Sequence, residues 1–140
     1  MSKKIVLVGG AFDILHKGHL IFLEKAKQQG DELVLLLESD EKIKKLKGEG
    51  RPVNTQSKRA AALKKLAIID KIISLHKNMA NSDYDKLILK IKPSVIATTK
   101  GDKNISHKLR QAQLTGAKLI EVTDLINGHS TTEILKKSGI

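Results

Sequence analysis

Blocks of aliphatic residues alternate along the chain with stretches whose apolar residues recur three or four positions apart. The first block, residues 4–8, runs without interruption to Gly9 and Gly10, and such a run is typical of a strand buried on both faces. Apolar positions then follow at helical spacing over residues 18–29, and Gly30 stands where a left-handed residue would end that helix. The opening of the chain therefore predicts a strand, a glycine turn and a helix.

The same alternation continues along the rest of the chain. It predicts strands over residues 4–8, 32–37, 71–75, 94–98 and 118–122, and helices over residues 18–29, 40–46, 56–67, 82–91, 106–115 and 131–137. Strands and helices that alternate through short connections favour βαβ units, in which helices cover both faces of a parallel sheet. We therefore expect one α/β domain, residues 1–140, with a doubly wound sheet of five parallel strands.

The composition limits the cellular compartments in which we expect the chain to occur. No apolar run approaches the ~20 residues that a membrane-spanning helix needs, and the apolar stretch behind the basic amino terminus is too short for a signal peptide. The chain has no cysteine, which excludes disulfides and thiolate metal sites. We expect a cytoplasmic protein that does not enter a membrane.

The charge balance points to anionic ligands. Lys and Arg number 26 against 15 Asp and Glu, a net charge of +11, which favours phosphorylated small molecules or polyanions. Single-stranded nucleic acids are bound on aromatic rings, and this chain has only Phe12, Phe22 and Tyr84. Many of the basic residues also spread along predicted helix faces, as solvated side chains do. We expect a small phosphorylated ligand and no nucleic acid.

The turn after the first strand is the strongest candidate for a binding site. Glycines let the backbone approach a ligand, and the start of the next helix offers free N–H groups with a partial positive charge. Asp13, His16 and His19 lie in this turn. Two imidazoles three residues apart at a helix start point the same way and can donate hydrogen bonds to a phosphate. A metal-binding pair and ordinary capping histidines are the alternatives that these residues alone leave open.

The segment from Gly10 to His19 resembles the G-x-F-D-x-x-H-x-G-H motif of the cytidylyltransferase-like nucleotidyltransferases, and Ser130-Thr131-Thr132 is similar to the second signature of that family. Ser130 with Glu133 also forms a capping box, which opens a helix whether or not a ligand binds there. The resemblance implies a Rossmann-like fold of the HIGH type, with His16 and His19 as catalytic residues. It further implies nucleotide contacts from Gly10, Ala11, Phe12, Asp13, Gly18, Gly101, Asp102, Ser130, Thr131 and Thr132.

The middle of the chain is most similar to one branch of this family, the adenylyltransferases that act on a heptose 1-phosphate in ADP-heptose synthesis. Residues 39–54 and Arg59 carry that likeness. It implies that Lys44 or Lys47 acts in catalysis by neutralising phosphates, and that Arg51 and Arg59 meet the phosphate of the acceptor.

Two departures bear on the choice of substrate. Residues 123–128 lack the arginine that the glycerol 3-phosphate cytidylyltransferase branch usually carries there, which disfavours CTP. Residues 98–103 read Thr-Thr-Lys-Gly-Asp-Lys, whereas the heptose branch usually has a Lys-Gly-Gly-Asp segment, and Gly101-Asp102 also suits a simple turn. Cytidylyl transfer to glycerol 3-phosphate, adenylyl transfer to flavin mononucleotide and a nucleotide-binding sensor are therefore the alternatives.

The expected reaction follows from the resemblance. The phosphate oxygen of the acceptor attacks the α-phosphorus of ATP, or of CTP, in line and expels pyrophosphate, and positioning with charge neutralisation does the catalysis. Mg²⁺ is expected to enter with the triphosphate, because it prefers phosphate oxygens and waters to a dedicated protein cage, so no protein metal ligand is predicted. The resemblance also implies a homodimer.

Overall fold

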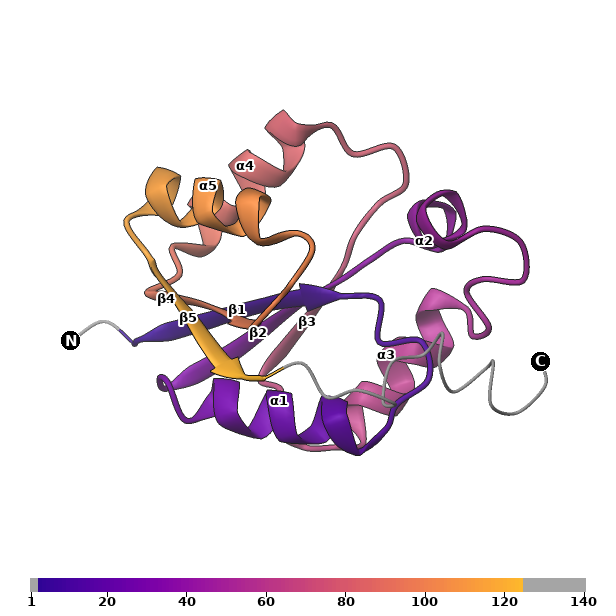
Figure 1. The fold of residues 1–140 in the computed structure, drawn as a ribbon, viewed down its shortest axis with the longest axis horizontal. Helices are drawn as coiled ribbons and strands as arrows, with labels where there is room; N and C mark the ends of the chain where they lie inside the picture. Colours follow the sequence, from indigo (N-terminus) through magenta and orange to yellow (C-terminus); the bar gives the residue numbers. More distant parts are fainter. Residues whose placement is uncertain (1–2, 125–140) are drawn as a thin grey trace.

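The computed structural model of this chain describes residues 3–124, in which parallel strands alternate with helices (Figure 1). The strands are β1 (Ile5–Gly10), β2 (Glu32–Leu37), β3 (Lys71–Ser74), β4 (Val95–Thr99) and β5 (Lys118–Thr123). The helices are α1 (Lys17–Lys27), α2 (Asp40–Lys47), α3 (Gln56–Lys64), α4 (Asn81–Ile91) and α5 (Ile105–Thr115). The helix expected over residues 131–137 and the hydroxyl triplet Ser130-Thr131-Thr132 lie outside the described residues.

The five strands form one sheet in the order β3-β2-β1-β4-β5, and each neighbouring pair is parallel. Strand β1 lies at the centre, between β2, which follows it in the chain, and β4. The strand order reverses at this point, and open α/β sheets bind ligands where that reversal occurs, outside the carboxyl ends of the strands. The doubly wound parallel sheet predicted from the sequence is confirmed.

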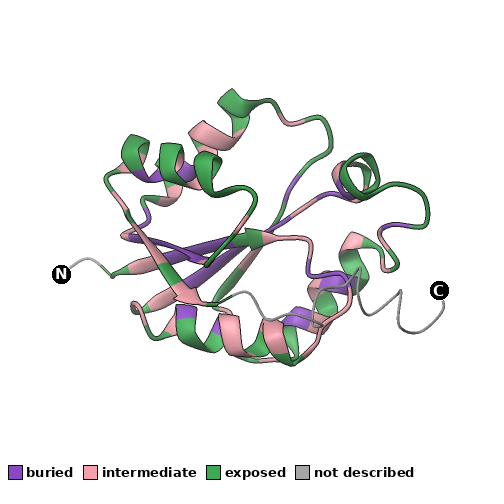
Figure 2. Ribbon diagram, viewed as in Figure 1, coloured by how far each residue is buried: buried purple, intermediate pink, exposed green. Residues whose placement is uncertain are grey.

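Helices cover both faces of the sheet (Figure 1): α1 and α3 lie on one face, and α4 and α5 on the other. Each face has its own buried core, and the central strands are the most buried part of the fold (Figure 2). Leu23 of α1 and Leu63 of α3 are completely buried on the first face, and Ile88 of α4 is completely buried on the second. Strand β1 serves both cores, because its successive side chains point to opposite faces.

Position 30 requires a glycine for a different structural reason than the sequence predicts. Helix α1 ends in the right-handed cap Gln28, and Gly30 is not among the residues with positive φ, so the prediction of a left-handed cap is wrong. A Cβ on Gly30 would instead lie 2.6 Å from the carbonyl oxygen of Lys4 and 2.8 Å from a methyl group of Val6. The glycine lets the chain pass close to the start of β1 as it enters β2.

Other differences concern the ends of elements. Helix α3 stops at Lys64 rather than at Ala67, which has a φ of +57°, and β1 continues through the two glycines. No helix within residues 3–124 is long and apolar enough to cross a membrane.

Candidate active site

The turn between β1 and α1 places two histidines at a helix start. His16 is the N-cap residue of α1, with an extended backbone, and its Nδ1 accepts a hydrogen bond of 3.1 Å from the backbone N–H of Gly18. Since Nδ1 accepts, the proton of the neutral ring is assigned to Nε2. His16 therefore fixes the start of the helix, where backbone N–H groups and the helix dipole favour an anion.

His19 lies directly against His16. The ring centroids are 3.9 Å apart and the rings are stacked at 26°, while the ring of Phe12 contacts His19 from another side at 5.3 Å. Burial is the largest cause, and together with the nearby His16 and Lys47 it lowers the pKa of His19 to about 4. Its buried Nδ1 has no hydrogen-bond partner among the described residues. At neutral pH this ring is uncharged and can offer an N–H to a ligand.

Phe12 supports this pair from the core. The sequence predicts a nucleotide contact here, whereas the structure places the ring in the α1 and α3 core with 7% of the residue exposed. Its φ of +48° is uncommon for a residue with a large side chain and costs on the order of 1–3 kcal/mol. A Cβ on Gly10 would lie 3.1 Å from the Phe12 ring, so the glycine leaves room for the ring to turn inward.

Asp13 holds a neighbouring loop. Its buried carboxylate accepts hydrogen bonds from the backbone N–H groups of Val53, at 2.7 Å, and Asn54, at 2.8 Å, and pairs with Arg51 at 3.4 Å. The Asn54 side chain donates in return to the Asp13 carbonyl at 2.7 Å. The sequence predicts a nucleotide contact for Asp13, and the structure gives its oxygens to the 51–54 loop, which it fixes beside the histidine turn.

Arg59 also differs from its predicted role. The residue is 1% exposed, and its guanidinium donates to the carbonyl oxygens of Ala11, Asn54 and Glu38 and pairs with Asp40 at 2.6 Å. A guanidinium enclosed by these acceptors does not face the solvent, which favours a structural role over the predicted contact with an acceptor phosphate; that contact stays a prediction. It ties the ends of β1 and β2 to the loop that Asp13 holds.

The two candidate lysines lie in different surroundings. Partial burial and the charges of Arg51 and Arg59 lower the pKa of Lys47, and the negative charge of Asp13 opposes this. Lys44 instead has a side chain that is 61% exposed and pairs with Glu49 at 3.8 Å. Only the Lys47 amine lies within the charged surroundings of the histidine turn, together with the largely buried Arg51.

The loop after β4 contains Gly101 and Asp102. Gly101 has a φ of +79°, and Asp102 accepts hydrogen bonds from the Thr98 hydroxyl at 2.6 Å, from the backbone N–H of Asn104 at 2.8 Å and from Lys108. Burial alone raises the pKa of Asp102, but the hydrogen bonds from Lys108, Thr98 and Asn104 outweigh it and lower the pKa. The two interpretations of Gly101-Asp102, a nucleotide contact and a simple turn, are both compatible with this hydrogen-bonded turn at the carboxyl end of β4.

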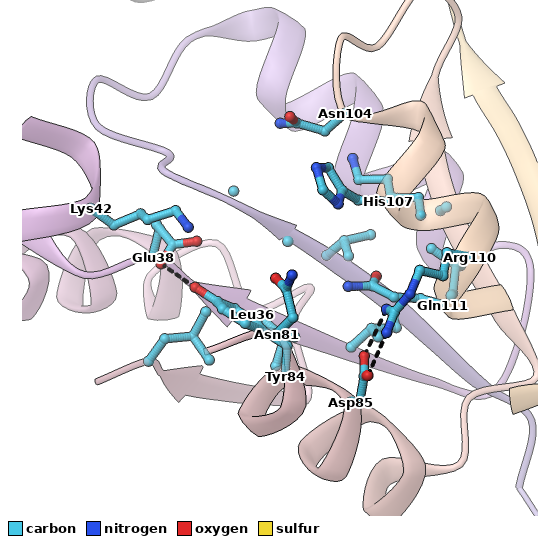
Figure 3. Close-up of a pocket in the computed structure, with 18 of the residues that line it drawn as sticks. Leu36, Glu38, Lys42, Asn81, Tyr84, Asp85, Asn104, His107, Arg110 and Gln111 are labelled. Carbon is cyan, nitrogen blue, oxygen red and sulfur yellow. Dashed lines mark hydrogen bonds and ion pairs between the residues drawn. The ribbon is translucent and has the colours of Figure 1, made fainter. Parts of the chain in front are cut away.

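Sequence reasoning missed a cavity on the other face of the sheet. It has a volume of about 290 Å³, lies between α4 and α5, and reaches Gly9 and Gly10 at the end of β1 (Figure 3). Glu38, Tyr84 and Gln111 are among the polar residues that line it. They come from separate elements and form no motif, so the sequence carries no signal that could have found them.

No group of three or more metal-ligating side chains occurs within residues 3–124. Asp13, the acidic residue of the histidine turn, already accepts two backbone N–H groups.

A parallel sheet that reverses its order beside a glycine turn, with two stacked histidines at the following helix start, defines a nucleotidyltransferase. The family model described as "Cytidylyltransferase-like" matches residues 7–137, and the chain belongs to this family. The fold class and the enzyme class that the sequence predicts are thus confirmed.

The chain is also similar in sequence to individual proteins named HldE. The chain is 38% identical to the "Bifunctional protein HldE" of Campylobacter concisus and 36% identical to that of Pseudomonas fluorescens strain Pf0-1, in each case over 97% of this chain. It spans only 27% and 28% of the length of those two relatives.

Solved structures agree with this assignment. A lipopolysaccharide core biosynthesis protein from Thermoplasma volcanium superposes with a TM-score of 0.71 at 26% identity, over 89% of this chain and all of that one. Pantothenate synthetase from Thermus thermophilus, at 14% identity and a TM-score of 0.60 over 87% of this chain and 56% of that one, shares the fold alone.

Proposed function

We propose that the chain transfers AMP from ATP to a heptose 1-phosphate and releases pyrophosphate. The observation that carries nucleotidyl transfer is the stacked pair His16 and His19 at the start of α1, directly after the β1 glycines. The heptose acceptor is supported by residues 39–54, by the HldE relatives and by the similarity to the lipopolysaccharide core biosynthesis protein of Thermoplasma volcanium. Because the chain spans about a quarter of the HldE proteins, only this one reaction is proposed for it.

The proposed mechanism is an in-line displacement without a covalent enzyme intermediate. The acceptor's phosphate oxygen attacks the α-phosphorus, and the bond to the pyrophosphate leaving group breaks on the opposite side. His16 and His19 donate hydrogen bonds to the charge that develops on the phosphate oxygens, and the N–H groups at the start of α1 add a fixed positive potential. The His19 ring enters the reaction neutral, as its lowered pKa indicates.

Lys47 is the proposed cation for the phosphates, because its amine lies in the same charged surroundings as His19. A bound polyphosphate would place negative charge beside this amine and would therefore raise the pKa of Lys47 again. When Mg²⁺ is bound, it would neutralise the triphosphate that carries it. Ser130, Thr131 and Thr132 stay predicted contacts of the β- and γ-phosphates.

The test is pyrophosphate release with ATP and with CTP, each against heptose 1-phosphate, glycerol 3-phosphate and flavin mononucleotide. We expect turnover with ATP and the heptose phosphate, reduced at least about a hundredfold in His16→Ala and in His19→Ala, since each removes a transition-state donor. His76→Ala removes an exposed histidine and should leave the rate unchanged.

Other outcomes identify the alternatives. Turnover with CTP and glycerol 3-phosphate alone would refute adenylyl transfer, and turnover with flavin mononucleotide alone would refute the heptose acceptor. ATP binding without pyrophosphate release from any pair would identify a sensor. Sedimentation velocity would test the homodimer, which stays a prediction.

A further inference from the structure

The turn that carries the two histidines contains a strained residue. Phe12 has a φ of +48°, in the left-handed region that large side chains rarely adopt, and its ring lies in the core, where it contacts the ring of His19 at 5.3 Å between centroids. His19 in turn stacks on His16. A strained backbone persists only where the surrounding structure holds it. The groups that hold Phe12 therefore also determine where the two imidazoles lie.

The backbone on both sides of Phe12 is held by donors from one distant segment. Arg59 donates from Nη1 to the carbonyl oxygen of Ala11 at 2.8 Å, and it lies 48 positions later in the chain. Asn54 donates from its side-chain Nδ2 to the carbonyl oxygen of Asp13 at 2.7 Å, and it lies 41 positions later. Ala11 precedes the strained residue and Asp13 follows it, so the turn is held at both ends from outside.

Asn54 is well placed for this task, because its own backbone is fixed. Its N–H donates to Oδ1 of Asp13 at 2.8 Å, and its carbonyl oxygen accepts from Nε of Arg59 at 3.1 Å. Since a carbonyl oxygen can only accept, the amide nitrogen of Asn54 must be the group that faces the Asp13 carbonyl. An aspartate or an apolar residue at position 54 could not make this hydrogen bond.

The Asp13 carbonyl lies close to the histidines along the chain. Two residues, Ile14 and Leu15, separate Asp13 from His16, which is the N-cap residue of α1. A shift of this carbonyl therefore moves the start of the helix, and with it the stacked rings of His16 and His19. The Asn54 amide acts on the histidines through the backbone of the turn.

We propose that Asn54 is a positioning residue for nucleotidyl transfer, which holds the Asp13 carbonyl and thereby aligns His16 and His19 with the reacting phosphate. Donors to a transition state depend steeply on their position, and a misplacement of about 1 Å can cost about a hundredfold in rate. An interaction that acts only in the transition state changes kcat and leaves substrate binding unaltered. The inference rests on the proposed function for the reaction whose rate is measured.

The kinetic test compares Asn54→Ala, which removes the amide and keeps the backbone N–H, with the matched control Thr55→Val. Thr55 is the N-cap of α3, and its hydroxyl accepts from the backbone N–H of Lys58 at 3.4 Å. Both substitutions remove one side-chain hydrogen bond, so a merely structural role predicts equal rates in the two variants. We expect kcat for pyrophosphate release to fall at least about tenfold in Asn54→Ala, with both KM values changed less than about threefold. Thr55→Val should keep the wild-type constants.

The titration of His19, followed by the NMR signals of its ring, tests the same step without any substrate. Burial, together with His16 and Lys47, lowers the pKa of His19 from 6.5 to about 4 in the wild-type chain. A turn loosened in Asn54→Ala would admit water to this ring, so the pKa of His19 should rise toward 6.5. In Thr55→Val the pKa of His19 should match that of the wild-type chain.

Three results would overturn the positioning role: an unchanged kcat in Asn54→Ala, equal losses of kcat in Asn54→Ala and Thr55→Val, or an unchanged His19 titration in folded Asn54→Ala. If the wild-type chain transfers nothing to heptose 1-phosphate, the proposed function fails, and the His19 titration alone decides the role of Asn54. Circular dichroism checks that each variant is folded. If Asn54→Ala does not fold, Asn54→Leu, which keeps much of the side-chain volume without its donor, is measured against the same expectations.

Discussion

Replacing Arg59 with methionine separates the two roles that sequence and structure assign to it. Methionine keeps much of the apolar stem and removes the guanidinium, so the packing loss is small and the hydrogen bonds are lost. In the structure those bonds reach three carbonyl oxygens, of Ala11, Asn54 and Glu38, and the carboxylate of Asp40. The variant therefore removes the connection between the ends of β1 and β2 and the 51–54 loop.

The expected cost can be worked from these contacts. An acceptor left buried without a partner costs about 1–3 kcal/mol, and the three carbonyls share one donor group, so their costs do not simply add. Asp40 has a side chain that is 39% exposed and regains water, so its part is small. The variant leaves no buried charge without a partner, so the cost comes mainly from the three carbonyl oxygens, and we expect the free energy of unfolding to fall by about 2–4 kcal/mol.

Urea unfolding followed by circular dichroism measures this change. Lys58→Met, an exposed position on the same helix, is the matched control and should stay within about 0.5 kcal/mol of the wild-type chain. If Arg59→Met also unfolds within 1 kcal/mol of the wild-type chain, while the KM for the sugar phosphate rises, Arg59 binds phosphate and the structural role assigned here is refuted.

Three further predictions concern single side chains. Because the pKa of His19 is about 4 in the folded chain and 6.5 in the unfolded one, the unfolded chain binds the proton first as the pH falls. The free energy of unfolding should therefore decrease by about 3 kcal/mol between pH 6.5 and pH 4, and urea titrations of His19→Gln should lack this part. Lys47→Met should slow pyrophosphate release about a hundredfold, and Lys44→Met should slow it less than about threefold. Equal effects of the two substitutions would refute the assignment of Lys47 as the phosphate-binding lysine. Gly30→Ala should destabilise by about 1–3 kcal/mol in urea, because the added Cβ meets the Lys4 carbonyl; an unchanged midpoint would show that the chain shifts freely there.

The features of this molecule that depend on neighbouring residues could be predicted well from the sequence. The aliphatic run of β1, the glycines behind it and the helical spacing after them are short-range signals, and the structure has the expected strand, turn and helix. The stacking of His16 on His19 follows from their three-residue spacing at a helix start, and it was within reach of sequence reasoning. The parallel sheet followed from the alternation of strands and helices, since parallel neighbours need such crossovers.

The partners of charged side chains could not be predicted in this way. Arg59 donates to Ala11, which lies 48 positions earlier in the chain, and Asp13 accepts from the 51–54 loop about 40 positions later. No spacing rule connects such positions, because only the folded sheet brings them together. The same holds for Gly30, whose need for glycine comes from the carbonyl of Lys4.

By itself, the sequence determined the order and type of the elements and the chemistry of the turn after β1, since these depend on neighbours within a few positions. The tertiary structure alone decided which cations remain available to a ligand and where the cavity between α4 and α5 opens. Arg59 is enclosed by backbone carbonyls while Lys47 lies near the histidines, and Glu38 faces Gln111 across a cavity that no motif marks. The physical reason is that burial and long-range hydrogen bonds depend on the packing of distant segments, whereas strand and helix patterns depend on local spacing.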